Sequence, residues 1–141
     1  MNISGYEGTA AIGYLWEDPD DDSDTTETLV ASGAVEHMAG GVSVKLAVGD
    51  EDEGGSYGWI QLGWEGDLTP IGPTSFSVDY WDGSDVNVDG SSSEAITLAA
   101  VQKIDDFNLE VYAAYRTYSY DEDADSYQDG DLLFAGARWR F

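Results

Sequence analysis

The sequence predicts an all-β protein, an antiparallel up-and-down transmembrane β-barrel of eight strands that forms a single domain over residues 1–141. Three observations predict this fold. Apolar and polar side chains alternate with a period of two in eight segments, as they do in strands with two unlike faces. Long acidic connections alternate with short ones, and all five Lys and Arg residues lie on one face of the alternation. The expected strands are residues 6–17, 28–39, 42–50, 56–66, 74–82, 93–104, 107–120 and 131–141.

Composition and charge exclude several classes of protein. No stretch approaches ~18 consecutive apolar residues, so only a closed barrel of strands could cross a bilayer. The chain has no cysteine, which excludes disulfides and thiol chemistry. Its formal net charge of -24 argues against nucleic acid as a partner, because nucleic acid selects basic surfaces. No positively charged segment precedes an apolar run at the N-terminus, so no signal peptide is expected.

The connections between the expected strands differ in length and charge. The first, third, fifth and seventh are long and hold most of the 29 acidic residues, whereas the second, fourth and sixth are short. Short turns at one end of the strands and long loops at the other are typical of outer-membrane barrels. With an even number of strands, both ends of the chain are expected on the short-turn side.

One face of the alternation is apolar and ends in aromatic residues. Aromatic belts at both borders of an apolar band are typical of proteins that span a membrane. A soluble barrel of lipocalin type, with the apolar face inside, remains the alternative. The positions of the aromatics and the absence of a lysine-rich surface favour the membrane interpretation. The expected interfacial belt consists of Tyr14, Trp16, Tyr80 and Tyr115 toward the long loops, and Tyr6, Trp64, Trp139 and Phe141 toward the short turns.

The opposite face carries the charges. An Arg or Lys that faces lipid costs roughly 2–4 kcal/mol at the bilayer midplane, so these side chains are expected to line the lumen. They form either a constriction that selects ions or a set of ion pairs that fills a narrow barrel, together with large inward aromatics. A closed eight-stranded monomer favours the second interpretation, and two copies joined into a wider barrel would favour the first. The lumen set is Glu36, Lys45, Glu65, Asp79, Lys103, Glu110, Arg116, Arg138 and Arg140; the inward aromatics are Tyr57, Trp59, Trp81, Tyr112, Tyr118 and Phe134.

The acidic loops are the second candidate site. No cofactor is required, but Asp121, Asp123, Asp125 and Asp129 have the spacing of the early positions of a calcium loop,. Ser126 stands where such a loop has a glycine, and Leu132 stands where it has a closing glutamate. A second oxygen-rich run covers residues 20–24. Weak Ca²⁺ or Mg²⁺ binding is therefore one hypothesis, and a solvated acidic rim that attracts cations is the other.

The sequence contains no recognisable catalytic arrangement. His37 is the only histidine, and no Ser-His-Asp set, glycine-rich phosphate loop or zinc-ligand spacing occurs. Catalysis by general bases or metal ions needs such constellations. We therefore do not expect an enzyme.

The last strand resembles a known family. Residues 132–141, which end in Ala137-Arg138-Trp139-Arg140-Phe141, are similar to the closing strand of Gram-negative porins, and residues 101–116 resemble hairpins of alphaproteobacterial general porins. The likeness covers about the last third of the chain. It implies a bacterial outer-membrane location, contact with lipid or lipopolysaccharide, and passive diffusion. General porins have sixteen strands, so half of a porin, a miniaturised porin, and a small barrel of the OmpA type all stay open.

Two functions follow as expectations. The first is a porin-like barrel for passive passage of small solutes or ions, with a weak cation preference that comes from the acidic loops. The alternative is a structural barrel with a plugged, ion-paired lumen that acts as an anchor or adhesion surface. The solute, the width of the lumen and a homo-oligomeric state are left open at this point.

Overall fold

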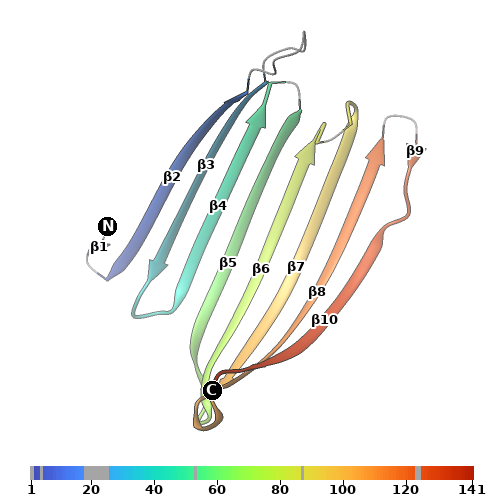
Figure 1. Cartoon of the computed structure of the whole chain (residues 1–141). Helices are drawn as coiled ribbons and strands as arrows, with labels where there is room; N and C mark the ends of the chain where they lie inside the picture. The colour runs from blue at the N-terminus through green and yellow to red at the C-terminus, as the bar shows by residue number, and fades with distance from the viewer. Residues whose placement is uncertain (1, 4, 18–25, 53, 87, 123–124) are drawn as a thin grey trace.

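The computed structural model describes residues 2–3, 5–17, 26–52, 54–86, 88–122 and 125–141. These residues form one antiparallel sheet in which each long strand pairs with its neighbours in sequence (Figure 1). The expected all-β, up-and-down order of eight long strands is confirmed. Two strands of two residues and one 3-10 turn were not expected. The elements are β1 (Asn2–Ile3), β2 (Tyr6–Glu17), β3 (Thr26–His37), β4 (Val42–Glu51), β5 (Gly55–Thr69), β6 (Gly72–Ser84), β7 (Ser91–Ile104), η1 (Asp105–Phe107), β8 (Leu109–Glu122), β9 (Asp125–Ser126) and β10 (Gly130–Trp139).

Turn residues explain where the strands differ from expectation. β3 ends at His37, two residues early, because the N–H groups of Gly40 and Gly41 both donate to the His37 carbonyl oxygen and form a turn. β8 begins at Leu109 because Asn108 adopts a left-handed conformation, with φ 49°, that closes the turn of η1. Asparagine tolerates this conformation better than most residues. Both short turns therefore set the register of the strands that they join.

We expect Gly41→Ala to destabilise the folded sheet by about 2 kcal/mol or more. Gly41 has a φ of +63°, and a Cβ atom there would overlap the carbonyl oxygen of Glu65 on β5. Gly58→Ala is the matched control, since a Cβ atom at Gly58 would meet nothing within 4 Å. Denaturant titration of the protein refolded in detergent measures both variants. Equal unfolding midpoints for the two would contradict this account of the turn.

The sheet is a skewed band rather than a rectangle. A row of paired residues that starts at Ala11 in the middle of β2 crosses every long strand and arrives at Gly130, the first residue of β10. β2 continues past that row to Glu17, and β10 continues in the other direction to Trp139. The sheet does not close, and β2 and β10 lie at its opposite sides (Figure 1). A skew of this kind is what a barrel needs if the sheet is to close with tilted strands.

The sheet is a single layer without a hydrophobic core. Ala95 is the only buried apolar residue among those described, and none of their side chains is completely buried. The accessible surface is 10018 Å², whereas a compact monomer of this mass exposes about 7,100 Å². No helix among the described residues is long and apolar enough to span a membrane. The two faces of the sheet must therefore be described separately.

Candidate functional site on the concave face

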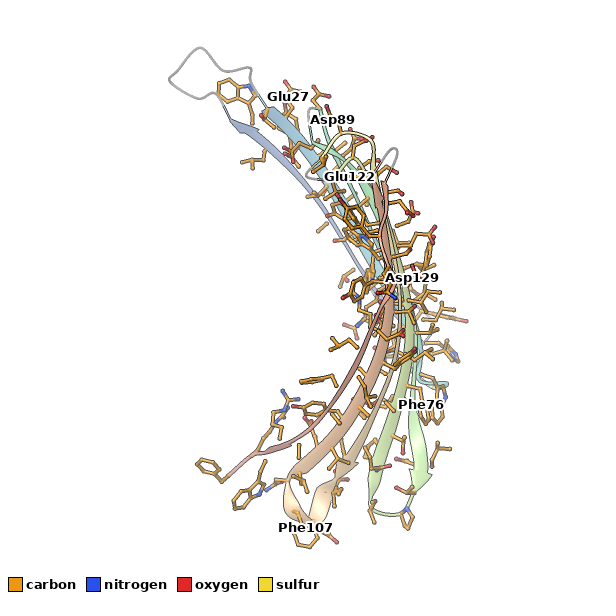
Figure 2. All side chains as sticks on the ribbon, turned by 90° about the vertical axis from the view of Figure 1, so that its right-hand side faces the viewer. Glu27, Phe76, Asp89, Phe107, Glu122 and Asp129 are labelled. Carbon is orange, nitrogen blue, oxygen red and sulfur yellow. The ribbon has the colours of Figure 1, made fainter. Side chains whose placement is uncertain are left out.

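The sheet curves along its strands, so that one face is concave and the other convex. Seen from the edge, Phe76 points away from the hollow side (Figure 2). Glu27, Asp89 and Glu122 lie at one end of the strands and Phe107 lies at the other, which separates an acidic loop end from a short-turn end. On the central strands the side chains of the concave face are mostly half-buried, and most apolar side chains of the convex face are exposed.

A polar row crosses the middle of the concave face. The row runs through neighbouring strands from β4 to β8, and its members are Lys45, Gln61, Asp79, Thr97 and Arg116. Gln61 and Thr97 separate the three charges, which are therefore two strand spacings apart, or about 9.6 Å. None of the ion pairs between described residues includes Lys45, Asp79 or Arg116. We call these five residues the charged row.

The other cationic residues are paired near the short-turn end. Lys103 Nζ lies 3.1 Å from Glu65 Oε2. Arg138 Nε donates to Glu110 Oε2 at 2.8 Å, and Arg140 lies 3.3 Å from the second oxygen of the same carboxylate. The two arginine side chains are largely exposed whereas the Glu110 side chain is 13% exposed. Ion pairs with exposed partners contribute roughly 0–1 kcal/mol each to the free energy of folding. This cluster therefore fixes the positions of the side chains on the concave face and adds little stability.

Glu7 belongs to the concave face and was missed in the sequence-based lumen set. It pairs directly with Glu36 across β2 and β3, and like charges in that position repel each other. Glu36 also lines a hollow of about 340 Å³ together with Lys45 and Glu65. The signal was present in the alternation, because Glu7 precedes Thr9 and Ala11 on the same face of β2. Five of the nine predicted lumen residues are thus brought together in ion pairs, and Glu36, Lys45, Asp79 and Arg116 are not.

Several inward aromatic rings lie against the wall of the sheet instead of projecting into its hollow. In three cases a tyrosine ring covers a glycine of the adjacent strand so closely that a Cβ atom there would overlap the ring. Such covering of glycines by aromatics is a known device for shaping β-sheets. The expectation from the sequence that large rings would fill the lumen therefore does not hold for these three tyrosines. The pairs are Tyr57 on Gly49, Tyr112 on Gly136 and Tyr118 on Gly130.

The convex face is apolar up to a border of tyrosines at the loop end. The Tyr80 hydroxyl lies 3.2 Å from Glu94 Oε1, and the Tyr115 hydroxyl donates to Asp131 at 2.8 Å. The two tyrosines thus mark the border of the apolar region, and carboxylates occupy the convex face beyond them. Tyr14 and Trp16 occupy the same end of β2, and their side chains are 62% and 56% exposed. All four predicted belt residues of the loop end therefore lie on the convex face.

The short-turn end of the convex face has a second group of rings. Tyr6 packs on His37 with ring centroids 4.8 Å apart, and Trp139 packs on Phe141 at 5.9 Å. Trp64 stacks on Phe76 at 6.2 Å. Between the two groups, a shallow apolar groove of about 610 Å³ lies over β5 to β10.

Gln102, which lies on the convex face opposite Thr74, has its polar atoms satisfied locally. Its amide nitrogen donates to the carbonyl oxygens of Gly72 at 2.9 Å and Lys103 at 2.7 Å, and its amide oxygen accepts from the Thr74 hydroxyl at 2.6 Å. Thr74 is itself buried, with 7% of its surface exposed. A hydrogen-bonded polar group costs little to bury, so Gln102 does not interrupt the apolar character of this face.

The acidic loops are described only in part. Asp123 and residues 18–25 lie outside the described residues, and the side chain of Asp125 is likewise not described. Asp121 and Asp129 are exposed, and the described residues contain no group of three acidic or histidine side chains placed to hold a metal ion. The Tyr127 hydroxyl donates to Glu122 at 2.9 Å, and this bond to a carboxylate raises the pKa of Tyr127. Weak binding of Ca²⁺ or Mg²⁺ stays a prediction.

No family model, no curated protein and no solved structure matches this chain. Its function must therefore be argued from the two faces of the sheet.

Proposed function

We propose that the chain forms the wall of a porin-like β-barrel in a bacterial outer membrane and lets small solutes or ions pass by diffusion, with a weak preference for cations. The concave face lines a water-filled lumen and the convex face contacts lipid. The observation that carries this proposal is the charged row. Lys45, Asp79 and Arg116 stand at mid-strand on the face opposite the apolar one, and none of them has an ion-pair partner among the described residues.

The convex face has the chemistry and the height of a lipid-contacting band. Leu62, Leu98 and Val78 stand at its centre and are 50%, 53% and 38% exposed, although no protein layer covers them. Tyr6 and Trp16 border the band on β2 and are ten residues apart. This separation is about 34 Å along a strand, or about 24–28 Å across a membrane for a strand tilted by ~35–45°, close to the ~25 Å band of known barrels.

The charged row needs water on the concave side. An unpaired charge in an apolar medium costs several kcal/mol, so Lys45, Asp79 and Arg116 cannot face lipid or a dry interior. In a water-filled lumen they stay solvated and act on passing ions. The net charge of -24 adds a negative potential at the acidic loops, which raises the local concentration of cations at the mouth.

A structural barrel with a plugged lumen is the second candidate. The cluster of Glu110 with Arg138 and Arg140, and the neighbouring pair of Glu65 and Lys103, favour it. Ion pairs that meet across a narrow interior would close the passage. The protein would then act as an anchor or an adhesion surface through its acidic loops.

Planar-bilayer recording of the refolded protein separates the two functions. We expect stable single-channel current steps for two reasons. The charged row is solvated, and the rings of Tyr57, Tyr112 and Tyr118 lie over glycines of adjacent strands. The same sample run on a gel before and after boiling must change its migration, as a folded barrel does. Folded protein in a silent bilayer would support the plugged alternative, and full solubility without detergent would contradict the membrane assignment altogether.

A further inference from the structure

We propose that a second copy of this chain completes the barrel, so that two eight-stranded sheets enclose one lumen of sixteen strands. The inference rests on the proposed membrane-spanning function and adds the partner that the open sheet needs. The partner copy contributes half of the lumen wall, and the passage is incomplete without it.

Both edges of the sheet are available for pairing. Within the described part of the chain, no strand pairs with the outer side of β2 from Thr9 to Glu17 or with the outer side of β10 from Gly130 to Trp139. The two stretches are similar in length, and β2 and β10 run in opposite directions. Unpaired backbone groups cannot face lipid, because the bilayer core offers no hydrogen-bond partners. Each edge therefore needs a strand to pair with, and in this proposal the opposite edge of a second copy supplies it.

The shape of the wall favours two copies. The two edges lie at opposite sides of the sheet in Figure 1, and the curvature that Figure 2 shows runs along the strands, so it does not bring the edges together. Tyr57, Tyr112 and Tyr118 lie on glycines of adjacent strands, which keeps these rings out of the hollow. A barrel of eight strands has an interior just wide enough for side chains, whereas sixteen strands leave an aqueous channel.

The charges of the concave face favour the same solution. Glu7 and Glu36 face each other on β2 and β3. The row of paired residues that continues from them across the sheet is uncharged, and all of its members except Phe134 are small. In a narrow, closed interior two carboxylates at this level would lose water, and the single charge of Lys45, which lines a small hollow with both of them, could offset only one of the two,. In a wide lumen they stay hydrated. The other members of the row are Ser43, Gly63, Ser77, Ala99, Ala114 and Phe134.

The two edges also carry complementary charges. Glu7 lies on β2 and makes none of the ion pairs between described residues, while Arg138 and Arg140 beside β10 share the single carboxylate of Glu110. If β2 of one copy pairs with β10 of the other, Arg138 and Arg140 come next to the part of β2 that follows Glu7, whose own outer side is paired with β1. The same contact occurs twice, because the two seams of such a dimer are identical.

The register of the seam follows from the skew. Strands tilted by about 35–45° slide by about eight to twelve residues around every eight strands, and the slide of eight corresponds to the smaller tilt. A slide of about eight residues from the row that joins Ala11 to Gly130 places Ile12 opposite Ala137 and Trp16 opposite Leu133. A large side chain then stands opposite a small one at Ile12, which suits close packing on the convex face.

The absence of cysteine from the chain allows a direct test of the seam. The variants Ile12→Cys and Ala137→Cys are prepared separately, mixed, refolded in detergent and oxidised. We expect a disulfide-linked dimer from the mixture and little from either variant alone, since each seam joins unlike positions. Ile60→Cys in the middle of the sheet, mixed with Ala137→Cys, is the matched control and should remain monomeric.

A chain that carries both Ile12→Cys and Ala137→Cys separates self-closure from dimerisation. We expect a dimer held by two disulfides on a non-reducing gel. A monomer with an internal disulfide would overturn the proposal, because it shows that the sheet closes on itself. Gel migration before and after boiling and bilayer recording are performed on the same samples. If the protein folds and conducts as an internally linked monomer, only the proposal that a second copy completes the barrel is refuted. If it never inserts into the bilayer, the proposed function is refuted as well.

Discussion

Replacing Leu98 with arginine is expected to prevent the protein from inserting into lipid vesicles, whereas arginine at the adjacent Thr97 is expected to be tolerated. Leu98 lies at the centre of the convex face and is 53% exposed, and Thr97 lies on the concave face in the charged row. Arginine that faces lipid at the midplane costs about 2–4 kcal/mol, which is a large part of the stability of a small domain. The measurement is the fraction of folded protein in vesicles, read from gel migration before and after boiling.

The pair of variants also tests which face is inside. Leu98→Ala is the control, because it shortens the side chain without adding charge and should insert nearly as well as the wild type. A soluble barrel of lipocalin type would place Leu98 in its core and Thr97 at its surface. In that case Leu98→Ala itself would destabilise the protein by about 2–5 kcal/mol, and the protein would fold without detergent or lipid.

Reversing the cationic charges of the charged row is expected to make the passage several-fold more selective for cations. In the variant Lys45→Glu with Arg116→Glu, both cations of the charged row become acids, while Asp79 stays in place. The reversal potential under a salt gradient measures the change. It should be largest near 0.1 M salt, where the Debye length is about 10 Å, and should shrink toward 1 M, where it is about 3 Å.

The control for this experiment keeps the charge and changes the shape. Arg116→Lys should leave the reversal potential close to that of the wild type, and Asp79→Lys should shift it toward anions. Lys103 offers a second comparison, because it is already paired with Glu65, and its replacement by methionine should change selectivity less. Equal effects of substitutions inside and outside the row would show that the acidic loops alone set the selectivity.

The strands and their two faces were predictable because both depend on local backbone geometry. Successive side chains in a strand point to opposite faces, so the alternation alone assigns Leu98 and Thr97 to different sides. The ends of β3 and β8 were less predictable. His37 closes the turn before β4 through its carbonyl oxygen, and Asn108 closes η1 before β8, and neither hydrogen bond is encoded in the period of the strand.

The partners within the candidate site depended on register, which no single strand contains. All nine predicted lumen residues share a face by parity, yet only the pairing of strands shows that Glu110 binds both Arg138 and Arg140. The glycines under the inward tyrosines belong to neighbouring strands, so the position of the Tyr57 ring follows from its pairing with Gly49 and not from its own segment.

The sequence by itself determined that this is an all-β chain with eight long strands, an apolar face that ends at Phe141, and a charged face that carries every Lys and Arg. Only the tertiary structure decided that Lys45, Asp79 and Arg116 stand in one row without ion pairs to other described residues, and that the described strands leave β10 and β2 from Thr9 onward as open edges. The physical reason is that the face of a side chain is a property of its own strand, whereas rows and edges arise from hydrogen bonds between strands, whose register is set by turns elsewhere in the chain.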